Sequence, residues 1–430
     1  KTYKALRVTS ERFPMGVETI YSPISNLLLF KCENGIINEY HYNKKSKMKV
    51  IIKTLANVLL IFLINISYAK SENIIKLGLL VPITGEHSYI GKSVIQSVRM
   101  GINKINNKNI TIFPRDTKSN PEETFRVVEE LYNDGIRIFI GPIFKTNTEN
   151  LNKFQDAIFL SLTNKTLDNP SNVISTGINA KSQFEAIKKY LELNELNETL
   201  VLIPKKEYKE EIEDAIIKSK TKTKKIFYYD AEPTELTKQI EKVTRYDIRK
   251  RNLEDEIKRV EESDEPDKEK KVERLKKKDT LGRIGFDSIV IADFDESLKS
   301  VATSLLYTDV SPKKVSFISL NQWFNETLFR EKSSQPISFP SINFKKYNDF
   351  KKEYNEIYNQ DPSQISILSY DLVGLVYYLL IQNDFEVDKK LFSKKNKFKG
   401  ISGTFEIKNN QINHILNFYS VEENNFKEIF

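Results

Sequence analysis

Cysteine and histidine are nearly absent from this chain of 430 residues, which has one cysteine, Cys32, and three histidines, His41, His87 and His414. A single cysteine forms no intramolecular disulfide. Cys32 also precedes the segment interpreted below as an export signal, so the exported protein would have no thiol for catalysis or zinc binding. The two histidines that remain are far apart in sequence and do not suggest a metal site. We therefore expect neither a metal nor a cofactor.

Most of the chain is nearly neutral, although the net charge of the whole sequence is +8. Residues 1–69 contain ten Lys or Arg and four Asp or Glu, which leaves a net charge of only +2 for residues 70–430. No basic stripe interleaved with aromatic residues is present, so nucleic-acid binding is not expected. Hydrophobic residues at 39% and charged residues at 29% are ordinary values for globular proteins, and the length suggests two or three domains.

A cleavable signal peptide is predicted over residues 48–69. Lys49 and Lys53 form its basic region, an apolar run covers residues 55–66, and Ser-Tyr-Ala at 67–69 supplies small residues for cleavage. The apolar run is shorter than the roughly 20 residues that a membrane-spanning helix needs. An uncleaved membrane anchor is the alternative.

The signal predicts a periplasmic protein without a stable membrane anchor after cleavage. No cysteine follows the apolar run, so we expect no lipid-modified amino terminus. A signal peptide works only at a true amino terminus, and we therefore interpret residues 1–47 as translation upstream of the natural start.

Short apolar runs alternate with amphipathic segments over the rest of the chain. Residues 74–81 have the pattern of a buried strand, and apolar side chains between residues 90 and 105 recur at the three- and four-residue spacing of a helix. Because parallel neighbouring strands need crossover connections, this alternation predicts parallel sheets covered by helices. Further strands are predicted at residues 110–113, 136–140, 157–162, 200–203, 226–229, 288–292 and 315–320.

The expected fold class is α/β, with two doubly wound parallel-sheet lobes joined by a hinge. Lobe 1 is expected to comprise residues 70–178 and 322–410, and lobe 2 residues 179–321 and 411–430.

One charged segment interrupts this pattern in lobe 2. Residues 245–283 are predicted to form an inserted helical hairpin, in which opposite charges recur at helical spacing, as in Glu273 with Lys277, and Pro266 lies in the turn. Two interpretations stay open. The hairpin is either a solvated spacer or a docking arm for a partner protein.

Candidate binding residues lie in the turns that follow the strands, because ligands of open parallel sheets bind beyond the carboxyl ends of the strands. The glycines of the first turn, Gly85 and Gly91, do not match a nucleotide-binding pattern. Capping of the following helices is the alternative role for the hydroxyl and amide residues. The candidate cleft residues are Thr84, Ser88, Tyr89, Phe144, Thr146, Ser161, Thr163, Asn164 and Tyr370.

No catalytic arrangement is evident, and we do not expect an enzyme. The chain has neither a G-x-S-x-G nor an H-E-x-x-H motif. Asp293 and Asp295 follow a predicted strand and are expected to act as caps or first-turn charges of the next helix.

The residues of the first half resemble a known family. The segment IKLGLLVPITG at 75–85, then Gly91, Asp116, Pro121 and Ile-Gly-Pro at 140–142, are similar to the opening of the leucine/isoleucine/valine-binding proteins. This resemblance implies the type I periplasmic-binding fold across the exported chain.

The second half resembles the penicillin-binding protein activator group within that fold. The matching segments are residues 279–282, 285–294, 369–371 and 400–405. The resemblance implies a regulatory role in peptidoglycan synthesis, exerted by contact with a bifunctional peptidoglycan synthase.

Two departures bear on function. Amino-acid receptors of this fold carry small hydroxyl residues in the turn where this chain has Phe144 and Lys145, and the best-known activators are lipoproteins. The first departure disfavours an amino-acid receptor, so the first hypothesis is an activator-type regulator. The alternative is a solute-binding receptor for an amino acid or amide, a small polar ligand, that serves the membrane subunits of an ABC importer.

Overall fold

The computed structural model describes residues 18–22, 27–31, 74–107, 109–392 and 396–430. The predicted signal peptide lies outside these residues, as do Cys32 and His41. Two compact units make up the chain, Lys1–Glu72 and Asn73–Phe430. In the first unit, β1 (Glu18–Ser22) pairs antiparallel with β2 (Leu27–Lys31).

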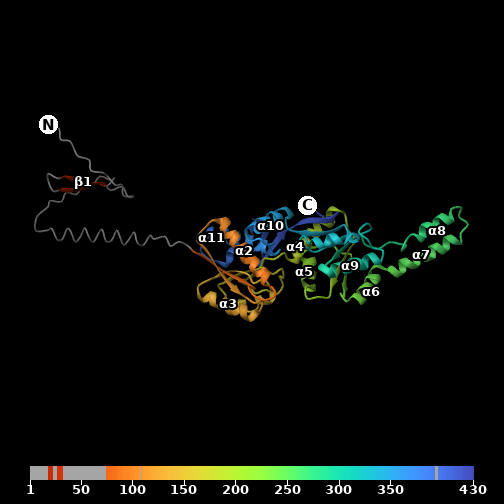
Figure 1. The fold of residues 1–430 in the computed structure, drawn as a ribbon, viewed down its shortest axis with the longest axis horizontal. Helices are drawn as coiled ribbons and strands as arrows, with labels where there is room; N and C mark the ends of the chain where they lie inside the picture. Colours follow the sequence, from red (N-terminus) through yellow and green to blue (C-terminus); the bar gives the residue numbers. More distant parts are fainter. Residues whose placement is uncertain (1–17, 23–26, 32–73, 108, 393–395) are drawn as a thin grey trace, which may run out of the picture. The chain divides into compact units, whose positions relative to one another are not determined.

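The second unit contains two β-sheets with helices packed on them (Figure 1). We call the lobe built on the first sheet lobe 1 and the lobe built on the second sheet lobe 2. This arrangement confirms the predicted α/β fold class, although both sheets are mixed rather than wholly parallel. Within the described residues, no helix is long and apolar enough to cross a membrane.

The sheet of lobe 1 has eight strands in the order β13-β14-β15-β7-β6-β5-β3-β4. Its pairs from β4 to β15 are parallel, whereas β13, β14 and β15 pair antiparallel at one end. The strands are β3 (Ile75–Val81), β4 (Ile110–Asp116), β5 (Ile138–Ile140), β6 (Ile158–Ser161), β7 (Val173–Ser175), β13 (Asn396–Lys399), β14 (Thr404–Lys408) and β15 (Gln411–Ile415).

Both faces of this sheet are covered, because successive side chains of a strand point to opposite faces. Ile140 belongs to the hydrophobic cluster that includes α2 (Ser88–Ile105) and α11 (Ser366–Ile381). Its neighbour Phe139 belongs to a second cluster with α3 (Pro121–Asn133). Figure 1 accordingly shows α2 and α11 together on one side of the sheet and α3 on the other.

The sheet of lobe 2 has seven strands in the order β17-β16-β12-β11-β10-β8-β9. The strands are β8 (Thr199–Pro204), β9 (Lys225–Tyr229), β10 (Ser288–Ile291), β11 (Ser316–Ser319), β12 (Ile337–Ser341), β16 (Asn417–Glu422) and β17 (Asn425–Glu428). The helices that follow its parallel strands or lead into them are α4 (Ala180–Leu193), α5 (Lys209–Ser219), α6 (Pro233–Thr244) and α9 (Asp295–Tyr307). Short 3₁₀ turns are η1 (Lys145–Thr148), η2 (Leu151–Lys153), η3 (Glu326–Arg330), η4 (Lys332–Ser334) and η5 (Lys389–Phe392).

The charged segment forms two neighbouring helices, α7 (Tyr246–Glu261) and α8 (Lys268–Lys276), which extend away from the sheet of lobe 2 (Figure 1). No residue of α8 is buried. The expected pair Glu273–Lys277 is present, and Arg259 pairs with Glu256 one helical turn before it. Most of the segment is therefore held by its own helix contacts and exposed ion pairs.

The described chain passes between the two sheets after Ser175, after Ser341 and after Ile415. Two strands lie in a different lobe from the one expected. β12 was expected in lobe 1 but pairs in parallel with β11, and β15 was expected in lobe 2 but pairs with β7. After the second crossing, α10 (Phe344–Tyr358) packs on lobe 1, where the hydroxyl of Tyr354 donates to Ser93 Oγ at 3.2 Å.

Buried polar side chains join the first and third crossings. Asn179 caps α4 by accepting from Ser182 N at 2.8 Å, and its Nδ2 donates to the carbonyl of Ile412 at 2.7 Å. The backbone N–H of His414 donates to Ser182 Oγ at 2.9 Å. His414 Nε2 lies 3.0 Å from the carbonyl of Thr176, so this nitrogen must carry the proton. The junction between the lobes is thus formed by buried, hydrogen-bonded side chains.

We predict that this junction makes stability depend on pH. Burial lowers the pKa of His414 to about 4, from an unfolded value near 6.5. A depressed pKa contributes stability that is present above pH 6.5 and is lost as the pH falls toward 4. Urea unfolding should show His414→Gln losing less stability than the wild type between pH 7.5 and 4.5, by roughly 2–3 kcal/mol. Equal losses would show that His414 does not titrate with folding.

Candidate functional site

The first cleft turn of lobe 1 is held by a carboxylate at the end of β4. Asp116 Oδ1 accepts from the backbone N–H of Ile83 at 2.8 Å, and Asp116 Oδ2 accepts from Thr84 Oγ1 at 2.6 Å. Partial burial raises the pKa of Asp116, but the hydrogen bonds from Thr84, Lys118 and Ile83 outweigh it and lower the pKa below its usual value. The hydroxyl of Thr84 is therefore engaged in shaping the turn.

Close packing fixes the start of α2 in this turn. A Cβ at Gly91 would lie 1.8 Å from the carbonyl oxygen of Pro82, so only glycine fits there. Ser88 is the first residue of the helix, and its N–H donates to the carbonyl of Gly85 at 3.1 Å. Tyr89 is half exposed, and its hydroxyl donates to the carbonyl of Asp361 at 2.8 Å.

The turns after β5 and β6 hold most of the other candidate residues. The ring of Phe144 lies 4.7 Å from that of His87, and Ser161 is buried with its hydroxyl donating to the carbonyl of Pro142 at 2.8 Å. Thr163 Oγ1 accepts from the N–H of Lys165 at 3.2 Å. Two further candidates, Thr146 and Asn164, are exposed. Phe144 and Ser161 therefore link neighbouring turns, whereas Thr163 stabilises its own turn.

Tyr370, expected among the cleft residues, lies in α11 instead. Its ring contacts Phe350 of α10 with centroids 5.9 Å apart, and its side chain approaches Gly101 of α2. The following residue, Asp371, is deeply buried and accepts from Ser402 N at 2.9 Å. Tyr370 and Asp371 therefore pack lobe 1 internally.

Lobe 2 contributes a buried carboxylate that sequence reasoning assigned to helix capping. Asp293 accepts from Tyr229 Oη at 2.6 Å, from Tyr208 Oη at 3.0 Å and from Lys206 Nζ at 3.0 Å. Burial and the neighbouring Asp293 charge raise the pKa of both tyrosines, so their hydroxyls remain protonated donors. The cap of α9 is Phe294, which makes no side-chain capping bond.

Contacts cross directly from one lobe to the other at this edge. The Nζ of Lys165 in lobe 1 lies 5.2 Å from the ring centroid of Tyr208 in lobe 2. Glu211 of α5 accepts hydrogen bonds from Thr166 and Leu167, which belong to the loop after β6. Polar groups of the two lobes therefore satisfy one another.

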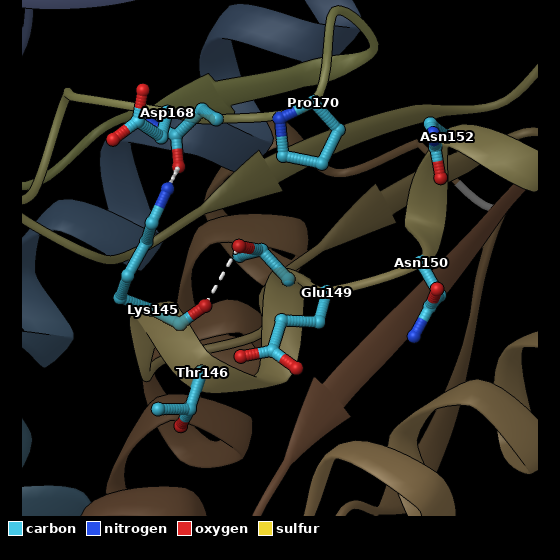
Figure 2. A pocket seen from close by; sticks show the side chains of 9 residues that line it. Lys145, Thr146, Glu149, Asn150, Asn152, Asp168 and Pro170 are labelled. Atoms are coloured by element: carbon cyan, nitrogen blue, oxygen red, sulfur yellow. Dashed lines mark hydrogen bonds between the residues drawn. The ribbon is translucent and has the colours of Figure 1, made fainter.

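A pocket of about 560 Å³ lies beside the turn after β5 (Figure 2). Thr146 is the candidate residue that lines it. Figure 2 shows Lys145 reaching across toward the loop that contains Asp168, and Lys145 Nζ donates to the carbonyl of Leu167 at 2.7 Å. The pocket is lined by Lys145, Thr146, Thr148, Glu149, Asn150, Asn152, Asp168, Asn169 and Pro170.

Three carboxylates at the cleft edge were not predicted as site residues from the sequence. They are Asp116, which holds the first turn, Glu211 and Asp293. Asp116 is the last residue of β4 and Asp293 follows β10, and a position at a strand end is a usable signal for a group at the cleft edge. Glu211 gave no such signal, because it lies in the first turn of an ordinary amphipathic helix.

The fold is that of the type I periplasmic-binding proteins. Residues 74–209 match the family model described as periplasmic binding protein. No curated protein matches the sequence.

Solved structures with this fold include both regulators and receptors. The C-domain of LpoA from Haemophilus influenzae, titled a regulator of PBP1A, is 14% identical with a TM-score of 0.54, over 83% of this chain and 100% of that one. A putative branched-chain amino acid ABC transporter protein from Rhodospirillum rubrum is 12% identical with a TM-score of 0.63, over 83% and 100%. The Streptococcus pneumoniae protein LivJ in complex with isoleucine is 16% identical with a TM-score of 0.51, over 83% and 99%.

We predict that Asp293→Ala destabilises lobe 2 by about 3 kcal/mol, because the buried hydroxyl of Tyr229 and the ammonium of Lys206 lose their acceptor. Urea unfolding of the variant measures the loss. Glu296→Ala is a suitable control, since this neighbouring carboxylate is exposed and pairs with Lys299 at the surface. A loss no larger than in the control would mean that the cluster is not a stabilising one.

Proposed function

We propose that this chain is an exported envelope protein that regulates peptidoglycan synthesis by contact with a peptidoglycan synthase. The observation that carries the proposal is that polar groups at the cleft edge are hydrogen-bonded to each other rather than open to a ligand. Glu211 of lobe 2 accepts hydrogen bonds from backbone N–H groups of lobe 1, and the ring of Phe144 packs on His87. A protein that works through its outer surface has no need of an open cleft. The C-domain of LpoA, a regulator of PBP1A, shares this fold.

Export by the signal at residues 48–69, with release into the periplasm, belongs to the same proposal. Its apolar run and Ser-Tyr-Ala site support it. The LivJ and LpoA structures share the fold but not enough sequence to transfer a role. The synthase partner is therefore proposed on the cleft geometry and on the charged hairpin.

The hairpin α7–α8 is the surface that we propose for the contact. Its base is anchored by Arg249, whose guanidinium donates to Thr244 O at 3.1 Å and to Thr280 Oγ1 at 2.9 Å. Beyond this base, residues 261–267 carry five acidic and no basic residues, while residues 268–278 carry seven basic and two acidic ones. An acidic tip beside a basic helix suits a partner with a complementary charge pattern.

We predict that the purified synthase of the same organism polymerises peptidoglycan faster when this protein is added. Lys270→Glu/Arg274→Glu/Lys278→Glu should weaken the affinity by about tenfold, because three exposed interface charges are reversed. Binding by surface plasmon resonance and polymerisation rate are the two measurements.

The matched control reverses two lysines and one arginine on the exposed face of α2, as Lys92→Glu/Arg99→Glu/Lys104→Glu. We expect this variant to bind as the wild type does. A second variant replaces residues 256–277 by a short Gly-Ser turn, which spares Arg249. Equal binding by the wild type and both hairpin variants would make the hairpin a spacer, and no effect on the synthase would refute the regulatory proposal.

A solute-binding receptor for an amino acid or amide is the second candidate. The observation behind it is the open pocket of about 560 Å³, which has room for a small polar molecule and is lined mainly by polar and charged side chains. We expect no rise in Tm with a panel of amino acids and amides. A receptor would instead gain about 2.7 kcal/mol at a 100-fold excess of ligand over Kd. Such a gain would establish the receptor function.

A further inference from the structure

The contact between Glu211 and lobe 1 has the form of a bound carboxylate. Glu211 Oε1 accepts from the N–H of Thr166 at 2.6 Å and from the N–H of Leu167 at 2.8 Å. Glu211 Oε2 accepts from the hydroxyl of Thr166 at 2.9 Å. One carboxylate thus takes three donors from a single loop of the opposite lobe, and its residue is only 8% exposed.

The donor loop is held in shape without help from Glu211. Asn169 Nδ2 donates to the carbonyl of Lys165 at 3.0 Å and to Ser175 Oγ at 2.7 Å. Lys145 Nζ donates to the carbonyl of Leu167 at 2.7 Å, which fixes the other end of the loop. Successive N–H groups fixed in this way form a concavity that accepts an anion.

Two lysines lie near this carboxylate. Burial lowers the pKa of Lys165 and of Lys145, against the opposing charges of Glu211 and Glu207 at Lys165 and of Asp168, Glu211 and Glu149 at Lys145. Glu211 could instead have turned back toward the start of its own helix, as a glutamate at the third helical position often does. In this structure its carboxylate reaches across to the other lobe.

We propose that the Thr166–Leu167 loop is a carboxylate-binding site and that Glu211 is its built-in occupant, which keeps the two lobes closed without a ligand. The site accepts carboxylates as a chemical class, and an external one binds only when Glu211 is removed. This inference does not depend on the proposed synthase contact.

The test measures the distance between the lobes in the full chain. Spin labels are placed at Glu129→Cys on α3 and Lys242→Cys on α6, both exposed, in a Cys32→Ser background. The unliganded parent should give one short, narrow distance by double electron–electron resonance. Glu211→Ala should lower the ratio of short to long distances by about tenfold, the size expected for losing a charged hydrogen-bonded contact.

Glu210→Ala is the matched control, because Glu210 is an exposed glutamate in the same helical turn. It should leave the distances unchanged. Sodium acetate should restore the short distance in Glu211→Ala, whereas sodium chloride at equal concentration should not. Circular dichroism and Tm of each variant separate opening from unfolding.

Thr166→Val removes one donor while keeping the side-chain shape, and it should open the lobes partially in the otherwise unchanged protein. Added to Glu211→Ala, it should abolish the rescue by acetate. An unchanged distance in Glu211→Ala would overturn the proposed closure. Rescue that is no greater with acetate than with chloride would overturn the carboxylate site.

Discussion

The architecture depends on the constraint that the chain crosses between its sheets more than once. Where the chain crosses, its backbone no longer pairs with a neighbouring strand. The backbone N–H and C=O groups of the crossing segment therefore need other hydrogen-bond partners inside the junction. Asn179, Ser182 and His414 provide them, from segments more than two hundred residues apart in sequence. Because these groups are buried and hydrogen-bonded to one another, relative motion of the lobes must preserve these bonds or break them at a cost in free energy.

The parallel part of the fold could be predicted from the sequence, whereas its antiparallel additions could not. β8 is buried at every position and β3 at every position except Lys76, so both appear as largely apolar runs. By contrast, β13 and β17 are short edge strands with exposed positions, and their pattern does not distinguish them from loops. β12 lies in lobe 2 between β11 and β16, and its pairing with β16 is a long-range contact that local periodicity does not encode.

The candidate site illustrates the same limit. The candidates do lie at strand ends, since Ser161 is the last residue of β6 and Thr84 and Thr163 lie in the loops that follow β3 and β6. What the side chains do there depends on partners elsewhere in the chain, such as Asp116 for Thr84. Tyr370 was expected in the cleft but packs inside lobe 1. The sequence around it did not reveal that its helix, α11, packs against α2 and α10.

Arg249 marks the boundary between the anchored base of the hairpin and its exposed distal part, whose sequence can vary more. Its guanidinium also donates to the carbonyl of Thr308, so the base of the hairpin is tied to the end of α9 as well as to Thr280. Beyond that point α8 has no buried residue. The length and sequence of the distal hairpin can therefore change without disturbing the lobe, which makes its tip a suitable place to insert an affinity tag or a fluorescent protein.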